Sequence, residues 1–232
     1  MYDPLEVDIS RELLKELSDE CKKRGIAFGI IGGWASYFYV NETYRRAFGR
    51  DYMGSRDIDV CFDHDKQKDF HALITELGFE KNGYNFRWEK IYQREQRIFI
   101  KQADAKKEHV YNLIYIFLDL FCADETRDIG TWHIEALRNL TYVSIEGFSL
   151  VDINTLISLK CVALFSRDKA DKENKDAYDL YALLEYSGQN VVLTHLLERA
   201  IQKILSRVDL IFGIAQYVLL DSHKQNIVLV CN

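Results

Sequence analysis

Two aspartates separated by a single residue, Asp57 and Asp59, give the first chemical lead in this sequence. They alternate with Ile58 and Val60 in an apolar segment that predicts a strand. Residues two apart on a strand point to the same face, so the two carboxylates are expected to project together. Two neighbouring carboxylates repel each other unless a cation lies between them. The pair therefore predicts a metal site, and oxygen ligands that act together with phosphate favour magnesium.

A third aspartate, Asp119, is the single acidic residue in the apolar run 110–121, which predicts a long strand. A carboxylate on a central strand is costly unless it is paired or bound to a metal, so Asp119 is expected to be the third ligand. The alternative is structural: Asp57 caps a loop and Asp59 forms a surface ion pair with Arg56.

Two consecutive glycines, Gly32 and Gly33, follow the apolar run 26–31, which predicts a buried strand. Glycine allows a sharp turn and a close approach of the backbone to a ligand. A helix is expected from Trp34 to about residue 45. The turn would then offer backbone amides and the positive end of a helix dipole to a phosphate group.

The remaining segments must position these residues, and they predict an α+β fold with a mixed sheet flanked by helices and a helical C-terminal part. A composition shift near residue 150 divides an α+β part, residues 1–150, from a helical C-terminal region, residues 151–232. The other expected elements are helices over 8–24 and 66–77, strands over 79–102 with a turn at 82–83, a polar loop over 104–109, a hairpin over 140–150, helices over 152–165, 172–186 and 191–206 and in part of 208–220, and a solvated turn over 169–175.

Composition sets limits on the function. The chain has 232 residues, 48% of them hydrophobic, and a net charge of −6, which argues against a general binder of nucleic-acid backbone. Its five scattered cysteines form no CxxC pair and indicate a reducing cytoplasm rather than a zinc site or disulfides. Apolar runs are too short to span a bilayer, so we expect a cytoplasmic protein without a membrane segment.

The order of Gly32-Gly33, Asp57-Ile58-Asp59 and Asp119 resembles the nucleotidyltransferase superfamily that shares the DNA polymerase β catalytic core. The Gly-Gly-Trp-Ala and Arg-Asp-Ile-Asp forms are similar to its AbiEii toxin and lincosamide nucleotidyltransferase-like branch. The helices that follow the core in that branch are matched by segments around Lys160, Arg167 and Lys175. Together these matches span residues 26–186.

This resemblance implies a nucleotidyltransferase that moves a nucleoside monophosphate from an NTP to a hydroxyl acceptor. Two Mg²⁺ ions would be held by the catalytic residues Asp57, Asp59 and Asp119. The superfamily commonly has Gly-Ser in its first motif, so phosphate contact here falls to backbone amides and to Ser36 or Ser55. The residues expected to bind the nucleotide are Gly32, Gly33, Ser36, Arg56, Lys160 and Lys175. The implied acceptors are a tRNA, a protein or a small hydroxylated molecule such as an antibiotic, and an antitoxin protein is a possible partner.

Other interpretations stay open at this stage. Arg56 either contacts phosphate or pairs with a neighbouring acid. Lys160 on an apolar helix face either extends to solvent or contacts nucleotide. Lys175 and Asp179 are spaced to pair on one helix face, which is a structural role. The alternative for the whole chain is a catalytically degenerate domain that binds a nucleotide or a protein.

Overall fold

The computed structural model describes residues 3–62, 64–84, 86–122, 140–166 and 170–219. The chain divides into two compact units. The first comprises Met1–Trp34 and Met53–Val151, and the second comprises Ala35–Tyr52 and Asp152–Asn232. Residues 35–52 therefore group with the C-terminal helices, although they precede Asp57 in the sequence. The expected division of the chain into two domains at residue 150 stays a prediction, because this grouping by contacts does not test whether the two parts fold independently.

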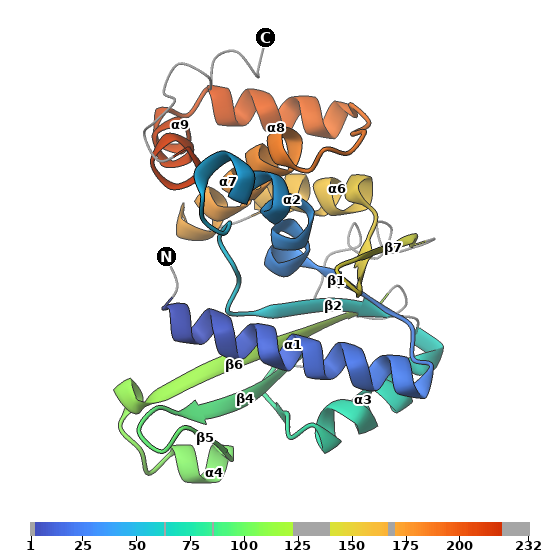
Figure 1. Ribbon diagram of the computed structural model, residues 1–232, viewed down its shortest axis with the longest axis vertical. Coiled ribbons are helices and arrows are strands. Elements are labelled where there is room, and N and C mark those ends of the chain that lie inside the picture. The colour runs from blue at the N-terminus through green and yellow to red at the C-terminus, as the bar shows by residue number, and fades with distance from the viewer. Residues whose placement is uncertain (1–2, 63, 85, 123–139, 167–169, 220–232) are drawn as a thin grey trace. The chain divides into compact units, whose positions relative to one another are not determined.

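The first unit is built on a mixed sheet with helices (Figure 1). Its strand order is β3-β4-β6-β2-β1-β8-β7, with β5 paired to β4. The pairs β2–β6 and β1–β8 are parallel, and the other pairs are antiparallel. Its elements are α1 (Pro4–Arg24), β1 (Phe28–Ile31), the start of α2 (Gly32–Phe48), β2 (Ile58–Phe62), η1 (His64–Lys66), α3 (Gln67–Glu76), β3 (Glu80–Lys81), β4 (Arg87–Gln93), β5 (Ile98–Ile100), α4 (Gln102–Ala105), η2 (Val110–Asn112), β6 (Leu113–Cys122), β7 (Tyr142–Ile145) and β8 (Phe148–Val151).

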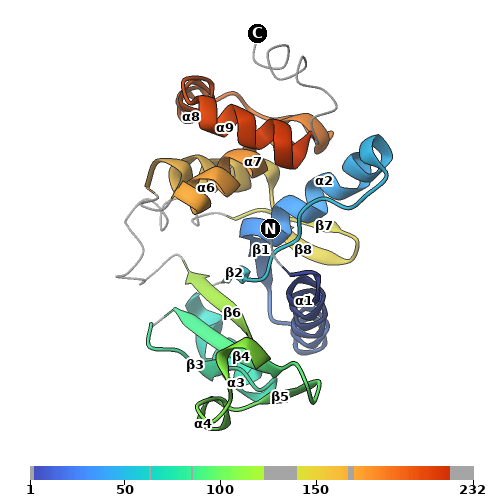
Figure 2. The same cartoon turned by 90° about the vertical axis from the view of Figure 1, so that its left-hand side faces the viewer.

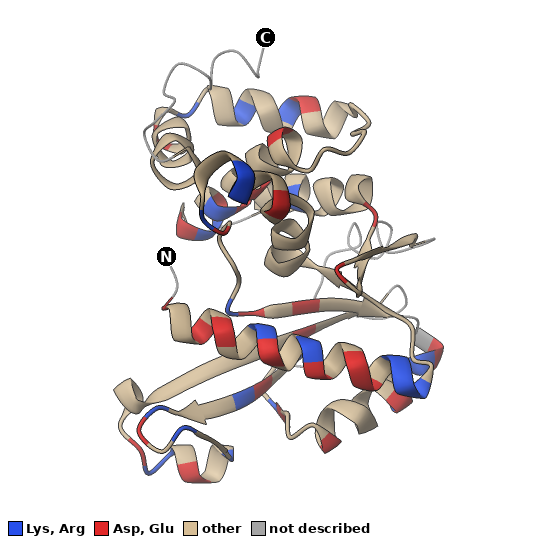
Figure 3. Cartoon of the chain, in the orientation of Figure 1, with Lys and Arg blue, Asp and Glu red and all other residues tan. Residues whose placement is uncertain are grey.

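The long helix α1 has clear start and stop signals. Asp3 caps it, because its side chain accepts a hydrogen bond from the Leu5 amide at 3.0 Å, and Pro4 occupies the first turn. It ends at Gly25, whose φ of 65° is the left-handed conformation that glycine adopts most easily. Lysines and arginines alternate with acids along α1 (Figure 3), while its apolar stripe faces the sheet.

One face of the sheet is covered by α1 and α3. Phe70 of α3 stacks on Phe62 of β2 with ring centroids 4.7 Å apart, and Ile58 and Val60 on the same side of β2 are fully buried. Burying a side chain of this size stabilises the fold by roughly 1.5–3 kcal/mol. Because side chains alternate along a strand, the residues between these apolar positions, Asp59 among them, project to the opposite face.

The second unit is helical. Besides the rest of α2 it contains α6 (Ile153–Ser166), α7 (Ala170–Tyr186), α8 (His195–Leu205), α9 (Val208–Gly213) and the π-helical turn η3 (Ile214–Val218). Figure 2 shows α8 and α9 beside α6 and α7, which they contact. The Tyr44 hydroxyl of α2 donates to the carbonyl of Val218 at 2.7 Å, and Tyr44 also packs edge-on against Tyr186. These contacts attach residues 35–52 to this unit.

The predicted α+β class, with a mixed sheet, flanking helices and a helical C-terminal part, is confirmed. Two local predictions are wrong. The polar loop expected over residues 104–109 begins inside α4, which is anchored where the Gln102 amide donates to Glu80 at 2.6 Å. The turn expected over residues 169–175 lies in α7 from Ala170 onward, because Glu173 is buried and pairs with Lys203 at 2.7 Å. In the described part of the chain, every helix is too short or too polar to cross a bilayer.

Candidate functional site

The glycine turn holds the first part of the candidate site. Strand β1 ends at Ile31, and α2 begins immediately at Gly32, whose φ is 66°. A Cβ atom built on Gly32 would lie 2.0 Å from the Oδ2 atom of Asp59, so the carboxylate rests directly against the glycine. Gly33 follows, buried in the first turn of the helix. Glycine at position 32 therefore serves both the turn and the placement of Asp59.

Gly32→Ala is expected to displace the Asp59 carboxylate as well as strain the turn. The strain of a left-handed alanine costs about 1–2 kcal/mol. Gly25→Ala is a matched control, because Gly25 has a φ of 65° and nothing within 4 Å of its added Cβ. Gly32→Ala should lose more stability than Gly25→Ala in urea denaturation, because only its Cβ meets the Asp59 side chain. If the chain binds nucleotide as the sequence predicts, only Gly32→Ala should also weaken that binding, by tenfold or more. Equal nucleotide binding by the two variants would contradict this role of Gly32.

Two of the three predicted carboxylates, those of Asp59 and Asp119, lie side by side on one face of the sheet. Asp59 and Asp119 are direct partners in the parallel pairing of β2 with β6. Asp57 immediately precedes β2, and both it and Asp59 act electrostatically on Arg87, the residue that pairs with Asp119. Asp59 and Asp119 lie opposite the face covered by α1 and α3. The shared metal-binding role predicted for the three acids stays a prediction.

Arg87 is the residue of this site that the sequence did not single out. It is the register partner of Asp119 in the pairing of β4 with β6, and its guanidinium donates to both carboxylate oxygens, Nε at 2.7 Å and Nη2 at 2.6 Å. The guanidinium also lies 4.7 Å from the ring centroid of Phe117. These hydrogen bonds to Asp119 raise the pKa of Arg87 against the opposing effect of burial, with Asp57 and Asp59 adding to the rise.

Arg87→Met should destabilise the protein by roughly 2–4 kcal/mol, because it leaves Asp119, with 9% of its side chain exposed, as an uncompensated charge. The double variant Arg87→Met/Asp119→Leu should be more stable than Arg87→Met alone. Arg11→Met is the control, since the Arg11–Glu146 pair at 3.8 Å is 44% and 46% exposed and should contribute less than about 1 kcal/mol. Urea denaturation of the wild type and these three variants measures the differences in stability; adding Asp119→Leu gives the coupling between Arg87 and Asp119. A double variant no more stable than Arg87→Met would show that Asp119 is stabilised by other groups.

The donor chemistry of the site fits magnesium in part. Within the described residues, no group of three or more His, Cys, Asp or Glu side chains is arranged to hold a metal ion. Asp57 and Asp59 are half-buried carboxylates on adjoining positions, which suits a hard cation that prefers oxygen ligands. Asp119 differs, because both of its oxygens accept hydrogen bonds from Arg87. Asp57 accepts one hydrogen bond, from Arg56, whereas both oxygens of Asp119 are held by Arg87, so Asp119 fits the ion only after Arg87 releases it.

Arg56 adopts the acid-pairing alternative. Its Nε donates to Oδ1 of Asp57 at 3.2 Å, and its guanidinium lies 5.8 Å from the ring centroid of Phe117. About a third of the Arg56 side chain is exposed (34%), so it also has access to solvent. Pairing with Asp57 does not exclude the phosphate contact predicted for Arg56, which stays a prediction.

The other residues expected to bind nucleotide belong to the second unit. Lys160 on α6 is buried, and its ammonium donates to Asp179 at 2.6 Å and Asp176 at 3.1 Å. Asp179 also accepts from the Tyr52 hydroxyl at 2.9 Å. Ser36 on α2 is buried and Lys175 on α7 is half-buried, while Arg167 lies outside the described residues. Nucleotide contact by these side chains stays a prediction.

No family model matches the sequence, and no curated protein matches it. Several solved structures are similar to this chain. An antigenic nucleotidyltransferase-like protein from Paracoccidioides brasiliensis is 16% identical over 91% of this chain and 94% of its own, with a TM-score of 0.48. The antibiotic-resistance factor ANT(2'')-Ia is 16% identical over 94% of this chain and 97% of its own, with a TM-score of 0.49. The lincosamide antibiotic adenylyltransferase LnuA, bound to lincomycin, is 13% identical over 75% of this chain and 96% of its own, with a TM-score of 0.41.

The chain is thus similar in structure to nucleotidyltransferase-like proteins, as the sequence resemblance predicted. At 16% identity or less and TM-scores below 0.5, this likeness assigns a role to no residue of the chain. The roles of Asp57, Asp59 and Asp119 depend on the geometry of the site itself.

Proposed function

We propose that the chain is a magnesium-dependent nucleotidyltransferase that moves a nucleoside monophosphate from an NTP to a hydroxyl acceptor. One observation carries this proposal: Asp59 and Asp119 lie side by side on one face of the sheet, with Asp57 just before β2 and with Asp59 resting on Gly32 of the glycine turn. Carboxylates next to a helix start that can receive phosphate are the parts that phosphoryl transfer needs.

Each residue of the first unit has a defined task in this reaction. The backbone amides at Gly32 and Gly33 would receive the triphosphate at the start of α2. Asp57 and Asp59 would hold magnesium, which when bound supplies positive charge against the charge of the triphosphate. Asp119 would accept the proton of the acceptor hydroxyl, whose oxygen forms the new bond to the α-phosphorus while pyrophosphate leaves. Arg87 must first release the Asp119 oxygens, and a phosphate group is the natural new partner for its guanidinium.

The finer features follow from the sequence resemblance. A contact between Arg56 and the triphosphate suits its place beside Asp57. The proposal also includes nucleotide contacts from Ser36, Lys160 and Lys175 and a second magnesium ion. It further includes a toxin-like role of the AbiEii type with an antitoxin partner, and a cytoplasmic location. A small hydroxylated acceptor and a tRNA are both compatible with it.

The test is a transfer assay with the full chain, each labelled NTP in turn, magnesium, and either total RNA or a set of small hydroxylated compounds. Label transferred to one acceptor class, and abolished by EDTA, is the expected result. Magnesium-dependent NTP binding is measured in parallel by calorimetry. Absence of both transfer and binding would overturn the proposal.

The Arg87–Asp119 pair favours a second candidate, a degenerate domain that binds a nucleotide without catalysis. In such a domain the guanidinium of Arg87 would permanently occupy the place next to Asp119 that a magnesium ion takes in the first candidate. This candidate predicts NTP binding that persists in EDTA, with no transfer to any acceptor. The same assay therefore separates the two candidates.

A further inference from the structure

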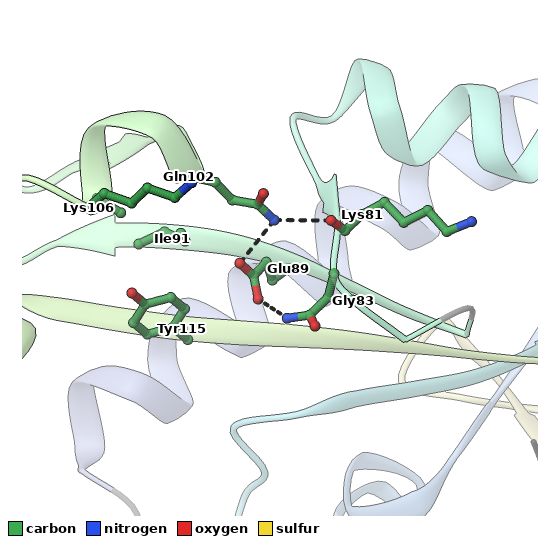
Figure 4. A pocket seen from close by; sticks show the side chains of 9 residues that line it. Lys81, Gly83, Glu89, Ile91, Gln102, Lys106 and Tyr115 are labelled. Carbon is green, nitrogen blue, oxygen red and sulfur yellow. Dashed lines mark hydrogen bonds between the residues drawn. The ribbon is translucent and has the colours of Figure 1, made fainter.

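A pocket of about 310 Å³ opens between β3, β4, β6 and α4 (Figure 4). Glu89 and Ile91 of β4 and Tyr115 of β6 line it on the sheet side, and Gln102 of α4 lies across from them. Glu89 is two positions from Arg87 on the same strand, so both side chains project to the face that carries the carboxylates. The pocket is therefore a neighbour of the candidate site on that face.

The order of the strands in the sheet shows on which side of the candidate site the pocket lies. The glycine turn follows β1, the aspartates lie on or just before β2 and on β6, and the pocket lies beyond them at β4 and β3. Two residues along a strand cover about 6.6–6.8 Å, which is the separation expected between the backbone positions of Glu89 and Arg87. The register places Glu89 opposite Phe117 and Ile91 opposite Tyr115, two and four positions along β6 from Asp119. If the triphosphate occupies the glycine turn, the pocket lies on the other side of Asp119, which is the side left for an acceptor.

Glu89 gives the pocket its chemical character. Its side chain is buried, with 7% of the residue exposed. It accepts hydrogen bonds from two neutral amides, the Nδ2 of Asn82 and the Nε2 of Gln102, the latter at 3.0 Å. Within the described residues, no basic group lies within ion-pair distance of its carboxylate. Gln102 is itself held in place, because its Nε2 also donates to the carbonyl of Lys81 at 3.1 Å.

An ionised carboxylate has about four lone-pair sites, and the two amides occupy only two of them. The carboxylate of Glu89 therefore keeps acceptor capacity for donors on a ligand. Lys106 also lines the pocket, whereas the side chain of Lys81 extends away from Glu89 (Figure 4). A cationic ligand would therefore meet the positive charge of Lys106, and a neutral hydroxyl group would not be repelled by it. Ile91 and the ring of Tyr115 provide the apolar surface against which a sugar ring can rest. The volume is at the lower end of the range for small-molecule sites, which suits a single ring.

We propose that this pocket is the acceptor subsite of the proposed transferase, and that it takes a small sugar-like molecule whose vicinal diol donates to Glu89. The inference rests on the proposed function, because only that function gives Asp119 an acceptor hydroxyl to activate. Glu89 is then a specificity-determining residue: it selects a ligand with two neighbouring hydroxyl donors. The same chemistry exists in a free sugar and in the terminal ribose of an RNA, and we commit to the free sugar.

The side-chain amide groups of Asn82 and Gln102 report on the pocket directly in NMR spectra of the ¹⁵N-labelled protein. Millimolar ribose or glucose should move these two signals, and the corresponding 2-deoxy sugars should move them at least fivefold less. Glu89→Gln should abolish the response, since its amide cannot replace the lost acceptor. Glu95→Gln, an exposed acid outside the pocket, is the matched control and should respond like the wild type. Signals that do not move in the wild-type protein would overturn the proposal, whatever the variants do.

Nucleotide binding and transfer are followed in the same samples. Glu89→Gln should bind NTP with magnesium within twofold of the wild type and should transfer label to the diol at least tenfold more slowly. Transfer to an RNA 3′ end but to no free sugar would overturn the pocket proposal and leave the proposed function intact. A sugar response without NTP binding or transfer would overturn the proposed function and, with it, the assignment of the pocket as an acceptor subsite.

Discussion

Asp59→Asn is expected to slow nucleotidyl transfer by at least about a thousandfold while leaving the fold intact. Asp59 is the central acid of the site, because it faces Asp119 across the β2–β6 pairing and rests against Gly32. Asparagine keeps the size and shape of the side chain but removes the negative charge that a magnesium ion needs. The substitution relieves repulsion from Asp119 but also removes the attraction between Asp59 and Arg87, so thermal stability should change little.

Initial rates with labelled NTP, measured over a range of magnesium concentrations, test this expectation. Asp19→Asn is the matched control, since Asp19 is an exposed acid of α1, the helix that covers the opposite face of the sheet. It should retain activity within twofold of the wild type. An Asp59→Asn variant that keeps a tenth or more of the wild-type rate would remove Asp59 from the metal site and with it the catalytic proposal in its present form.

The site residues predicted from the sequence have local signals. An apolar strand that ends in Gly32-Gly33 predicts the turn, and alternation in Asp57-Ile58-Asp59 predicts which side chains share a face. Asp119 stands out because it is the single acid of a long apolar run. Periodicity and composition are sufficient for such features, because each depends on a few consecutive residues.

The pairing of Arg87 with Asp119 has no local signal. It depends on the register between β4 and β6, which joins residues 32 positions apart. Around Arg87 the sequence shows only aromatic residues interleaved with basic ones. Such a pattern can stack nucleic-acid bases, but a half-buried hairpin explains it more simply. Tyr52 and Asp179, 127 positions apart, are a second case. Such contacts arise from tertiary packing, which overrides what a short window of sequence can show.

The most destabilising single substitution outside the first unit should be Lys160→Met. Lys160, Asp176 and Asp179 are 7%, 4% and 1% exposed, so the lysine is the cation that compensates two buried carboxylates. Removing one partner of a buried charge cluster costs about 3–5 kcal/mol, because the remaining charges stay buried without compensation. Methionine keeps most of the volume of the lysine side chain, which limits the contribution of a cavity to the loss.

The surroundings of Lys160 also determine how its contribution to the stability of the protein depends on pH. Burial disfavours the charged lysine, yet Asp179 and Asp176 raise the pKa of Lys160 above its ordinary value. A raised pKa means that the stabilisation is fully present below the unfolded value of about 10.4 and is lost only as the pH rises through the folded pKa. Titration of Lys160 itself should therefore leave its contribution to stability unchanged between about pH 6 and 9.

Urea denaturation at two pH values within this range measures both expectations. Lys172→Met is the matched control, because Lys172 is exposed on α7 and its loss should change stability by less than about 0.5 kcal/mol. The triple variant Lys160→Met/Asp176→Asn/Asp179→Asn should recover most of the lost stability, since it removes the uncompensated charges together with the lysine. If Lys160→Met is as stable as the wild type but binds NTP tenfold more weakly, the ammonium serves the nucleotide rather than the two aspartates. The nucleotide contact predicted from the sequence would then replace the structural role argued from these distances.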